Sequence, residues 1–195
     1  MNRKIDVIYL PGLGDNSYSW QMWLLRLWQP LGLKVLFLPI KWGDGEPFEP
    51  KLKMAVKFID KLTKNGDKVA IVGVSAGASA ALNLYMAESR KVSVVVFICG
   101  KIQGFKTTNP RYFIRNPAFK ESLRLSEKLI EELQDTDKAK LLCLKAVHDG
   151  LVLSHDSTID GTKIKTVPAI GHLLGIIYSL TAGAPFIARY IRSRT

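Results

Sequence analysis

The chain has 195 residues, of which 47% are hydrophobic and 23% are charged, the proportions of a soluble globular protein with a sizeable core. Its two cysteines, Cys99 and Cys143, both lie in apolar, strand-like runs, which excludes a disulfide framework or metal site and favours reduced core thiols. The net charge of +11 favours anionic substrates or surfaces. No nucleic-acid-binding motif accompanies it, so no nucleic-acid partner is expected.

Residues 5–10 form the first predicted strand. Two basic residues precede this run, but it is too short for a secretory signal peptide, and Asp6 interrupts it. Together with the reduced cysteines, this pattern predicts a protein of a reducing compartment, the cytoplasm.

A loop over residues 11–17 leads to a predicted helix over residues 18–28, with Ser17 as its expected N-cap. Aromatic and leucine side chains recur along this helix at helical spacing: Trp20, Trp23, Leu24, Leu27 and Trp28. The tryptophans are expected to pack in the core. A strand over residues 35–38 follows. A turn-rich loop over residues 39–50 then precedes an amphipathic helix that reaches Leu62.

Further strands are predicted over residues 68–72, 92–99, 141–147 and 163–167, because each is a short run rich in β-branched residues. Helical patterns separate most of the strands. Six strands connected in this way predict an α/β fold: a three-layer α/β/α sandwich around a mostly parallel six-stranded sheet. Residues 1–195 are expected to form this one domain.

Residues 173–188 contain no charged residue and therefore resemble a short membrane anchor. The stretch is shorter than the ~20 residues that a spanning helix needs, and Pro185 lies within it. A buried terminal helix or helix pair is expected instead.

Residues 101–136 interrupt the alternation of strands and helices. Two Asn-Pro pairs mark turns, and the second starts a helix that extends to about Leu133. This insertion is expected to stand over the carboxyl edge of the sheet as a small lid or cap, although an ordinary crossover helix with a long entry loop fits the same pattern. Five basic residues without an acidic one lie over residues 101–120, which suits an anionic substrate or membrane surface: Lys101, Lys106, Arg111, Arg115 and Lys120.

The pentapeptide Gly73-Val74-Ser75-Ala76-Gly77 lies between a predicted buried strand and an Ala- and Leu-rich helix. A Gly-x-Ser-x-Gly sequence in this context is typical of a nucleophile elbow. The turn is so sharp that a Cβ at position 73 or 77 would crowd neighbouring backbone. The elbow would present the Ser75 hydroxyl at the carboxyl edge of the sheet, where ligands bind.

A serine nucleophile needs a general base within hydrogen-bond reach. Of the three histidines, His172 follows the last predicted strand, whose carboxyl end lies at the same edge of the sheet as Ser75. His148 ends the preceding strand and His155 lies in a short helical stretch, so His172 is the favoured base.

The base in turn needs an orienting acid. Asp149 follows the strand over residues 141–147 and is therefore predicted to lie behind the imidazole of His172. Asp156 and Asp160 lie further into the same loop and are the alternatives.

The order Ser75, Asp149, His172, together with the elbow, resembles the α/β-hydrolase superfamily. Residues 149–152 are similar to its Asp-x-x-Val stretch, and Gly171-His172 is similar to its Gly-His pair. The resemblance extends over almost the whole chain, but the two antiparallel strands that begin the family's sheet have no counterpart, which implies a minimal member.

The resemblance also implies an oxyanion hole built from backbone N–H groups. One is expected from Ala76, directly after the nucleophile at a helix N-terminus. The other is expected from Leu13 in the loop after the first strand, where this chain has Pro11-Gly12 instead of the family's frequent His-Gly.

The predicted function is that of a serine hydrolase that cleaves carboxylic esters or thioesters, with no metal or organic cofactor. Two alternatives stay open. A non-catalytic relative would bind a small ligand or partner protein through the same pocket, and a lipase would act at an anionic membrane surface through residues 101–120. The sequence indicates no oligomeric state.

Overall fold

A computed structural model of the protein describes residues 4–14 and 18–195. Ser17, the predicted N-cap, lies outside these residues. The strands pair in parallel throughout, in the order β2-β1-β3-β4-β5-β6. Their bounds are β1 (Ile5–Leu10), β2 (Leu33–Phe37), β3 (Val69–Val74), β4 (Val92–Ile98), β5 (Leu141–His148) and β6 (Lys163–Ile170).

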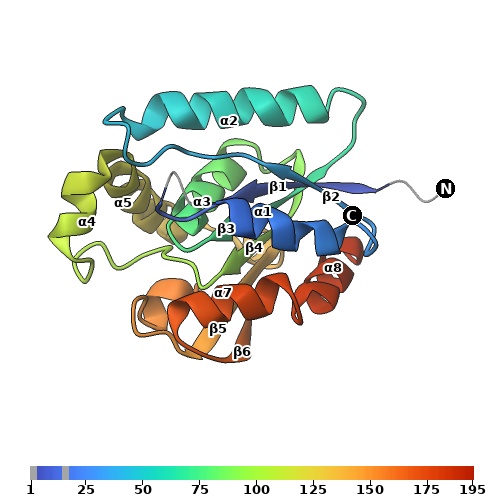
Figure 1. The fold of residues 1–195 in the computed structure, drawn as a ribbon. Coiled ribbons are helices and arrows are strands. Elements are labelled where there is room, and N and C mark those ends of the chain that lie inside the picture. Colours follow the sequence, from blue (N-terminus) through green and yellow to red (C-terminus); the bar gives the residue numbers. More distant parts are fainter. Residues whose placement is uncertain (1–3, 15–17) are drawn as a thin grey trace.

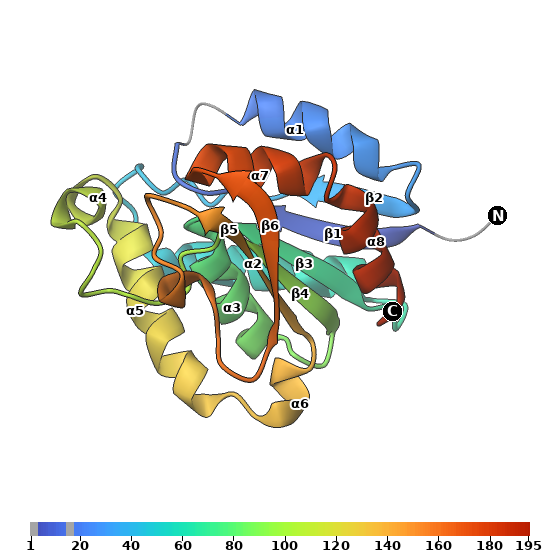
Figure 2. The same cartoon turned by 90° about the horizontal axis from the view of Figure 1, so that it is seen from below.

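Helices cover both faces of the sheet, as Figures 1 and 2 show. One face carries α2 (Phe48–Leu62), α3 (Gly77–Ala87) and α5 (Pro117–Glu132), and the other carries α1 (Ser19–Leu25), the 3₁₀ helix η1 (Arg26–Trp28), α7 (His172–Leu180) and α8 (Ala184–Arg192). Three short helices lie in the connections: α4 (Pro110–Arg115), α6 (Asp135–Lys138) and η2 (His155–Ser157). The predicted three-layer α/β/α architecture is confirmed.

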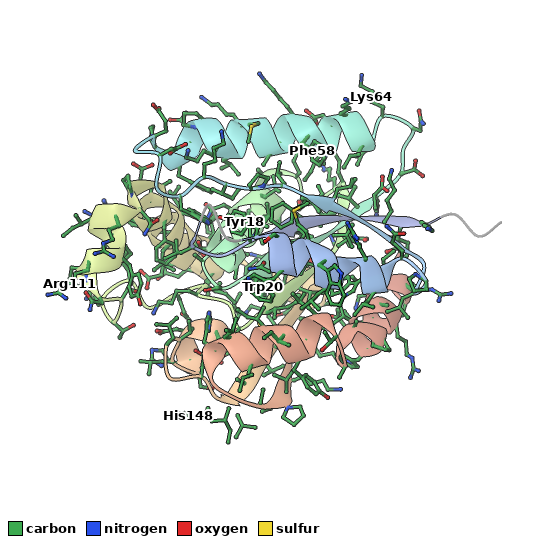
Figure 3. The ribbon with its side chains drawn as sticks, viewed as in Figure 1. Tyr18, Trp20, Phe58, Lys64, Arg111 and His148 are labelled. Atoms are coloured by element: carbon green, nitrogen blue, oxygen red, sulfur yellow. The ribbon has the colours of Figure 1, made fainter. Side chains whose placement is uncertain are left out.

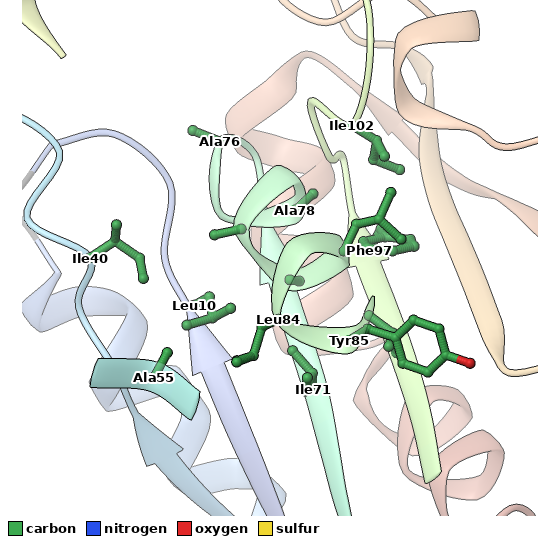
Figure 4. Packing of buried hydrophobic residues seen from close by; sticks show 14 of the residues in the cluster. Leu10, Ile40, Ala55, Ile71, Ala76, Ala78, Leu84, Tyr85, Phe97 and Ile102 are labelled. Atoms are coloured by element: carbon green, nitrogen blue, oxygen red, sulfur yellow. The ribbon is translucent and has the colours of Figure 1, made fainter. Parts of the chain in front are cut away.

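The central strands are apolar on both sides because each sheet face has its own core. Every residue of β3 and β4 is buried. Ile71 packs into the core beneath α2 and α3, which Figure 4 shows from close by, whereas its neighbour Val72 packs into the core beneath α7 and α8. This alternation explains why these strands read as continuous hydrophobic runs.

The helix predicted over residues 18–28 consists of α1 followed by the 3₁₀ turn η1. Trp28 is fully buried, but Trp23 is 63% exposed and Leu27 is 47% exposed. The expectation that the tryptophans of this segment pack in the core is therefore wrong for Trp23. Trp23 and Leu27 are one helical turn apart, so they share a stripe that faces away from the sheet.

Strand β6 is an edge strand that pairs only with β5. It extends to Ile170, three residues beyond its predicted end, and therefore includes Pro168. Proline is tolerated in an edge strand, where its missing N–H removes no essential ladder bond. As a consequence, His172 begins α7 instead of lying in a loop.

The apolar C-terminal stretch forms α7 and α8, in line with the predicted helix pair. No single helix in the described ranges is long and apolar enough to cross a membrane; only α7 and α8 together pass that test, with a 60° bend between them. The first turn of α7 departs from the expected burial, since Leu173 and Leu174 are 56% and 58% exposed.

Candidate active site

Ser75 occupies the sharp turn between β3 and α3. Its φ angle of +52° lies in the left-handed region, an unfavourable conformation for a residue with a side chain. A Cβ built on Gly73 would lie 2.6 Å from the carbonyl oxygen of Gly77, and one built on Gly77 would lie 2.2 Å from the carbonyl oxygen of Leu10. The turn therefore needs glycine at both positions, and it leaves the Ser75 side chain at the carboxyl edge of the sheet.

The structure brings together the three side chains that the sequence analysis selected. The Ser75 Oγ lies 2.9 Å from Nε2 of His172. On the other side of the ring, Nδ1 of His172 lies 2.9 Å from both carboxylate oxygens of Asp149. A hydroxyl, an imidazole and a carboxylate thus form one continuous hydrogen-bonded chain.

The Asp149 carboxylate is held ready for this role by its own loop. Its Oδ1 accepts hydrogen bonds from the backbone N–H groups of Leu151 at 3.1 Å and Val152 at 2.8 Å. Burial is the largest influence and raises the pKa of Asp149, but the hydrogen bonds from His172 and from these amides together outweigh it, so the net pKa is lowered. Asp149 is therefore ionised near neutral pH and can stabilise a protonated imidazole.

His172 is positioned by the start of α7. Gly171, with a φ of +101°, makes the turn from β6, and its N–H donates to the carbonyl oxygen of His148 at 2.6 Å. One turn further, Gly175 packs so closely that an added Cβ would lie 2.7 Å from Cys99 Sγ. This close approach fixes the helix end that carries the imidazole.

The alternative residues lie elsewhere. The His148 side chain is exposed at the end of β5, near the lower margin in Figure 3. His155 Nε2 lies 2.7 Å from Oδ1 of Asp156, and Asp160 is exposed. None of these side chains has a hydrogen bond to Ser75 or His172 among the described residues.

The loop after β1 lies against the serine. Leu13 and Ala76, the two predicted oxyanion-hole residues, both line the cavity that contains Ser75. Gly12, which the sequence analysis did not select, packs on the serine itself: an added Cβ would lie 2.8 Å from Ser75 Cβ. Buried side chains hold this loop, because Trp42 Nε1 donates to the carbonyl of Pro11 at 3.3 Å and the Tyr18 hydroxyl to that of Gly12 at 3.2 Å.

The cavity beside Ser75 has a volume of about 260 Å³. This is at the small end for a ligand site. Its walls combine apolar and hydrogen-bonding side chains and come from the loop after β1, the elbow, the 149–152 loop and the 101–119 segment. The lining residues are Leu13, Ser75, Ala76, Lys101, Thr107, Thr108, Asn109, Tyr112, Phe119, Leu151 and Val152.

The predicted lid segment has two distinct parts. Helix α5 belongs to the outer layer of the sandwich, where Ser122 Oγ lies 2.8 Å from Ser79 Oγ of α3 and the Ser122 carbonyl accepts from the Asn83 amide at 3.0 Å. The preceding loop and α4 contribute Thr107, Thr108, Asn109 and Tyr112 to the cavity wall. The loop and α4 thus contribute to the cavity wall, while α5 packs as a crossover helix would.

Lys101 does not belong to the exposed basic patch that the sequence analysis expected. Its side chain is buried and pairs with the buried Asp156 carboxylate, which also accepts from the Thr107 hydroxyl at 2.9 Å. The backbone carbonyl of Asp156 accepts from the N–H of Ile102 at 3.0 Å. This cluster fastens the cavity wall to the loop that carries Asp149.

No family model and no curated protein matches the chain, but solved structures do. The monoacylglycerol lipase of Paleococcus ferrophilus is similar over 99% of this chain and 97% of its own, with a TM-score of 0.70 and 15% identity. The carboxylesterase EstE1, from a metagenomic library, is similar over 98% of this chain and 80% of its own, with a TM-score of 0.71 and 16% identity.

The chain has the α/β-hydrolase fold. A lipase-esterase related protein from Clostridium acetobutylicum is similar as well, over 100% of this chain and 96% of its own, with a TM-score of 0.66 and 15% identity. The described strands of this α/β-hydrolase fold contain no antiparallel pair, as expected for a version that lacks the first two strands. His172 and Asp149 follow its last two strands, and Ser75 follows its central strand β3.

Proposed function

We propose that the protein is a serine hydrolase that cleaves carboxylic esters or thioesters through an acyl-Ser75 intermediate. The observation that carries this proposal is the hydrogen-bonded chain from Ser75 through His172 to Asp149, which opens into a cavity at the carboxyl edge of the sheet. The three residues follow three different strands, β3, β5 and β6, and a binding protein would have no need for that alignment. The similarity to lipases and esterases supports the same class of reaction.

In the first half of the reaction, the Ser75 Oγ attacks the acyl carbon while Nε2 of His172 accepts the hydroxyl proton. The ionised Asp149 stabilises the resulting imidazolium. Negative charge develops on the former carbonyl oxygen, and the N–H groups of Ala76 and Leu13 are proposed to donate to it. The imidazolium then protonates the leaving alcohol or thiol as its bond to the acyl carbon breaks.

In the second half, water replaces the alcohol. His172 removes a proton from this water as its oxygen attacks the acyl carbon of acyl-Ser75, and the same oxyanion site stabilises the second tetrahedral intermediate. Protonation of Ser75 Oγ by His172 releases the carboxylic acid and restores the starting state. Each proton moves through Nε2, so the mechanism requires no metal or organic cofactor.

The direct test is to compare the wild-type protein with Ser75→Ala on p-nitrophenyl acetate and a matched thioester. The variant should lose at least ~10³-fold in kcat and retain its thermal unfolding temperature. A fluorophosphonate probe should label the wild-type protein at Ser75 and leave the variant unlabelled. Ser154→Ala, at an exposed serine of the 149–157 loop, is the matched control and should keep full activity.

Two results would decide against the proposal. Hydrolysis by Ser75→Ala at the wild-type rate would remove the serine from the mechanism. A folded wild-type protein that neither hydrolyses esters nor reacts with the probe would instead favour the non-catalytic alternative, a pocket that binds a small ligand or partner.

A further inference from the structure

Large hydrophobic side chains are exposed on segments at the carboxyl edge of the sheet, the edge that also holds the Ser75 cavity. They come from α4, from the loop after β5, and from the junction of β6 and α7. We call this set the apolar rim: Ile114, Leu151, Leu153, Ile170, Leu173 and Leu174, which are between 53% and 81% exposed. Exposed apolar side chains are ordinary when they are scattered, but their concentration at one edge marks an interaction surface.

The apolar rim is continuous with the proposed active site. Leu151 lines the cavity together with Ser75, and Leu173 directly follows His172 on α7. Figures 1 and 2 place α4 and the start of α7 at the same end of the molecule, where the strands finish. A surface that covers Leu151 and Leu173 therefore lies beside the cavity that contains Ser75.

Helix α4 presents the most exposed member of the rim. Ile114 is 81% exposed, whereas the neighbouring Phe113 is buried and stacks on Phe105 with ring centroids 4.7 Å apart. The backbone N–H of Arg111 donates to the Asn109 side chain at 3.0 Å, which caps the helix. The buried ring and the cap hold α4 in place, so Ile114 projects outward from a fixed support.

Cations surround Ile114. Arg111 and Arg115 lie on the same short helix and are exposed, as are Lys106 and Lys120 nearby. Among the ion pairs of the described residues, none involves these four side chains. Figure 3 shows Arg111 at the outer edge of the molecule, away from Lys64 at the far end of α2.

We propose that this face docks the protein on an anionic phospholipid surface, with Ile114 inserted among the lipids and Arg111 and Arg115 on the lipid phosphates. Apolar tips flanked by free cations are the combination that holds a protein at such an interface. The rim residues stand on three separate segments of the chain, which suits a fluid surface better than the fixed shape of a protein partner. Docking would bring the Ser75 cavity to esters in the lipid layer.

This inference concerns binding and does not require hydrolysis, so it is tested on the Ser75→Ala protein. Its cosedimentation with phosphatidylglycerol-containing vesicles is measured at low salt, with pure phosphatidylcholine vesicles for comparison. The double variant Arg111→Ser/Arg115→Ser should bind the anionic vesicles about 25-fold more weakly, because each basic side chain at such a surface contributes about fivefold. Ile114→Ser should bind at least about tenfold more weakly, because an inserted isoleucine side chain is removed from water.

Matched controls come from α2 and the turn after it, outside the apolar rim. Lys61→Ser/Lys64→Ser removes the same charge, and Met54→Ser removes a side chain that is 48% exposed. Both controls should bind like the parent. Added salt should weaken binding of the parent more than that of the double arginine variant, because fewer charge contacts remain in the variant.

Three outcomes would overturn the proposal: no preference of the parent for anionic vesicles, equal losses in the α2 controls and the α4 variants, or full binding by both α4 variants. Binding to soluble polyglutamate without vesicle binding would assign the face to an acidic protein partner and so contradict the lipid proposal. Circular dichroism verifies that each variant is folded. Vesicle binding in a protein that hydrolyses no ester would contradict only the proposed function.

Discussion

Gly12 offers a sharp test of how the loop after β1 supports the serine. In Gly12→Ala the new Cβ would lie 2.8 Å from Ser75 Cβ and 3.3 Å from Ser75 Oγ. Apolar atoms in ordinary contact are ~3.5–4.0 Å apart, so the overlap is about 0.7 Å or more. The loop cannot retreat freely, because Tyr18 and Trp42 hold its carbonyl groups. The Ser75 side chain must therefore shift, which disturbs its alignment with Nε2 of His172.

Overpacking of this kind costs ~1–3 kcal/mol. If the strain falls on the geometry of the hydroxyl and imidazole, the corresponding loss in kcat/KM is about 5-fold to 150-fold. Steady-state hydrolysis of p-nitrophenyl acetate gives the rate, and thermal unfolding gives the stability.

Gly45→Ala is the control. No atom lies within 4 Å of its added Cβ, so the variant tests only the backbone strain of an alanine at a φ of +83°. This variant should lose ~1–2 kcal/mol of stability and no activity. A Gly12→Ala enzyme with wild-type kcat/KM and an unchanged unfolding temperature would refute the reasoning.

Three further predictions concern charges and thiols. Asp149→Asn should lower kcat by ~10³-fold or more, because the orienting carboxylate is lost. Folding lowers the pKa of Asp149, so its ionised form stabilises the wild-type protein above the unfolded-state pKa of about 4. This advantage over Asp149→Asn should be lost as the pH falls below that value and through the lowered pKa of the folded protein, as measured by thermal unfolding at a series of acidic pH values. Asp156→Ala should lower the free energy of unfolding in urea by ~3–5 kcal/mol, because it leaves the buried Lys101 ammonium unpaired. The double variant Lys101→Met/Asp156→Leu removes both charges and should cost clearly less. Equal costs would show that the two charges are not coupled. Burial raises the pKa of the Cys99 thiol to about 12 and also raises that of Cys143. Ellman's reagent should therefore react with neither thiol in the native protein and with both after denaturation. Rapid labelling of the native protein would contradict the burial.

The sequence predicted best those elements whose hydrophobic pattern follows directly from their place in the sheet. The runs at β3 and β4 are buried on both faces, so their hydrophobicity is continuous and easy to read. Parallel connection then places the ends of β3, β5 and β6 at one edge. For that reason the proximity of Ser75, Asp149 and His172 could be predicted without coordinates.

Features that depend on tertiary packing were out of reach. The partnership of Lys101 with Asp156 joins residues far apart in the chain, so the lysine read as one more member of a basic cluster. In the sequence, Gly12 is one of several loop glycines, and only the folded loop shows its contact with Ser75. Trp23 is exposed because its side of α1 faces away from the sheet. The five apolar residues of this segment are spread around most of the helix, so the sequence does not show which side is buried.

The free side of β6 affects how the protein behaves when it is concentrated. Outward-facing N–H and C=O groups on an edge strand can recruit a second strand and extend the sheet from molecule to molecule. Here Lys163 and Lys165 stand on that strand, and Pro168 withholds one donor near its end. A second copy that approached edge to edge would meet the positive charge of these two lysines, whose ammonium groups lie over the rings of Tyr190 and Phe186 on α8. The same residues that terminate the sheet thus oppose its growth into fibres.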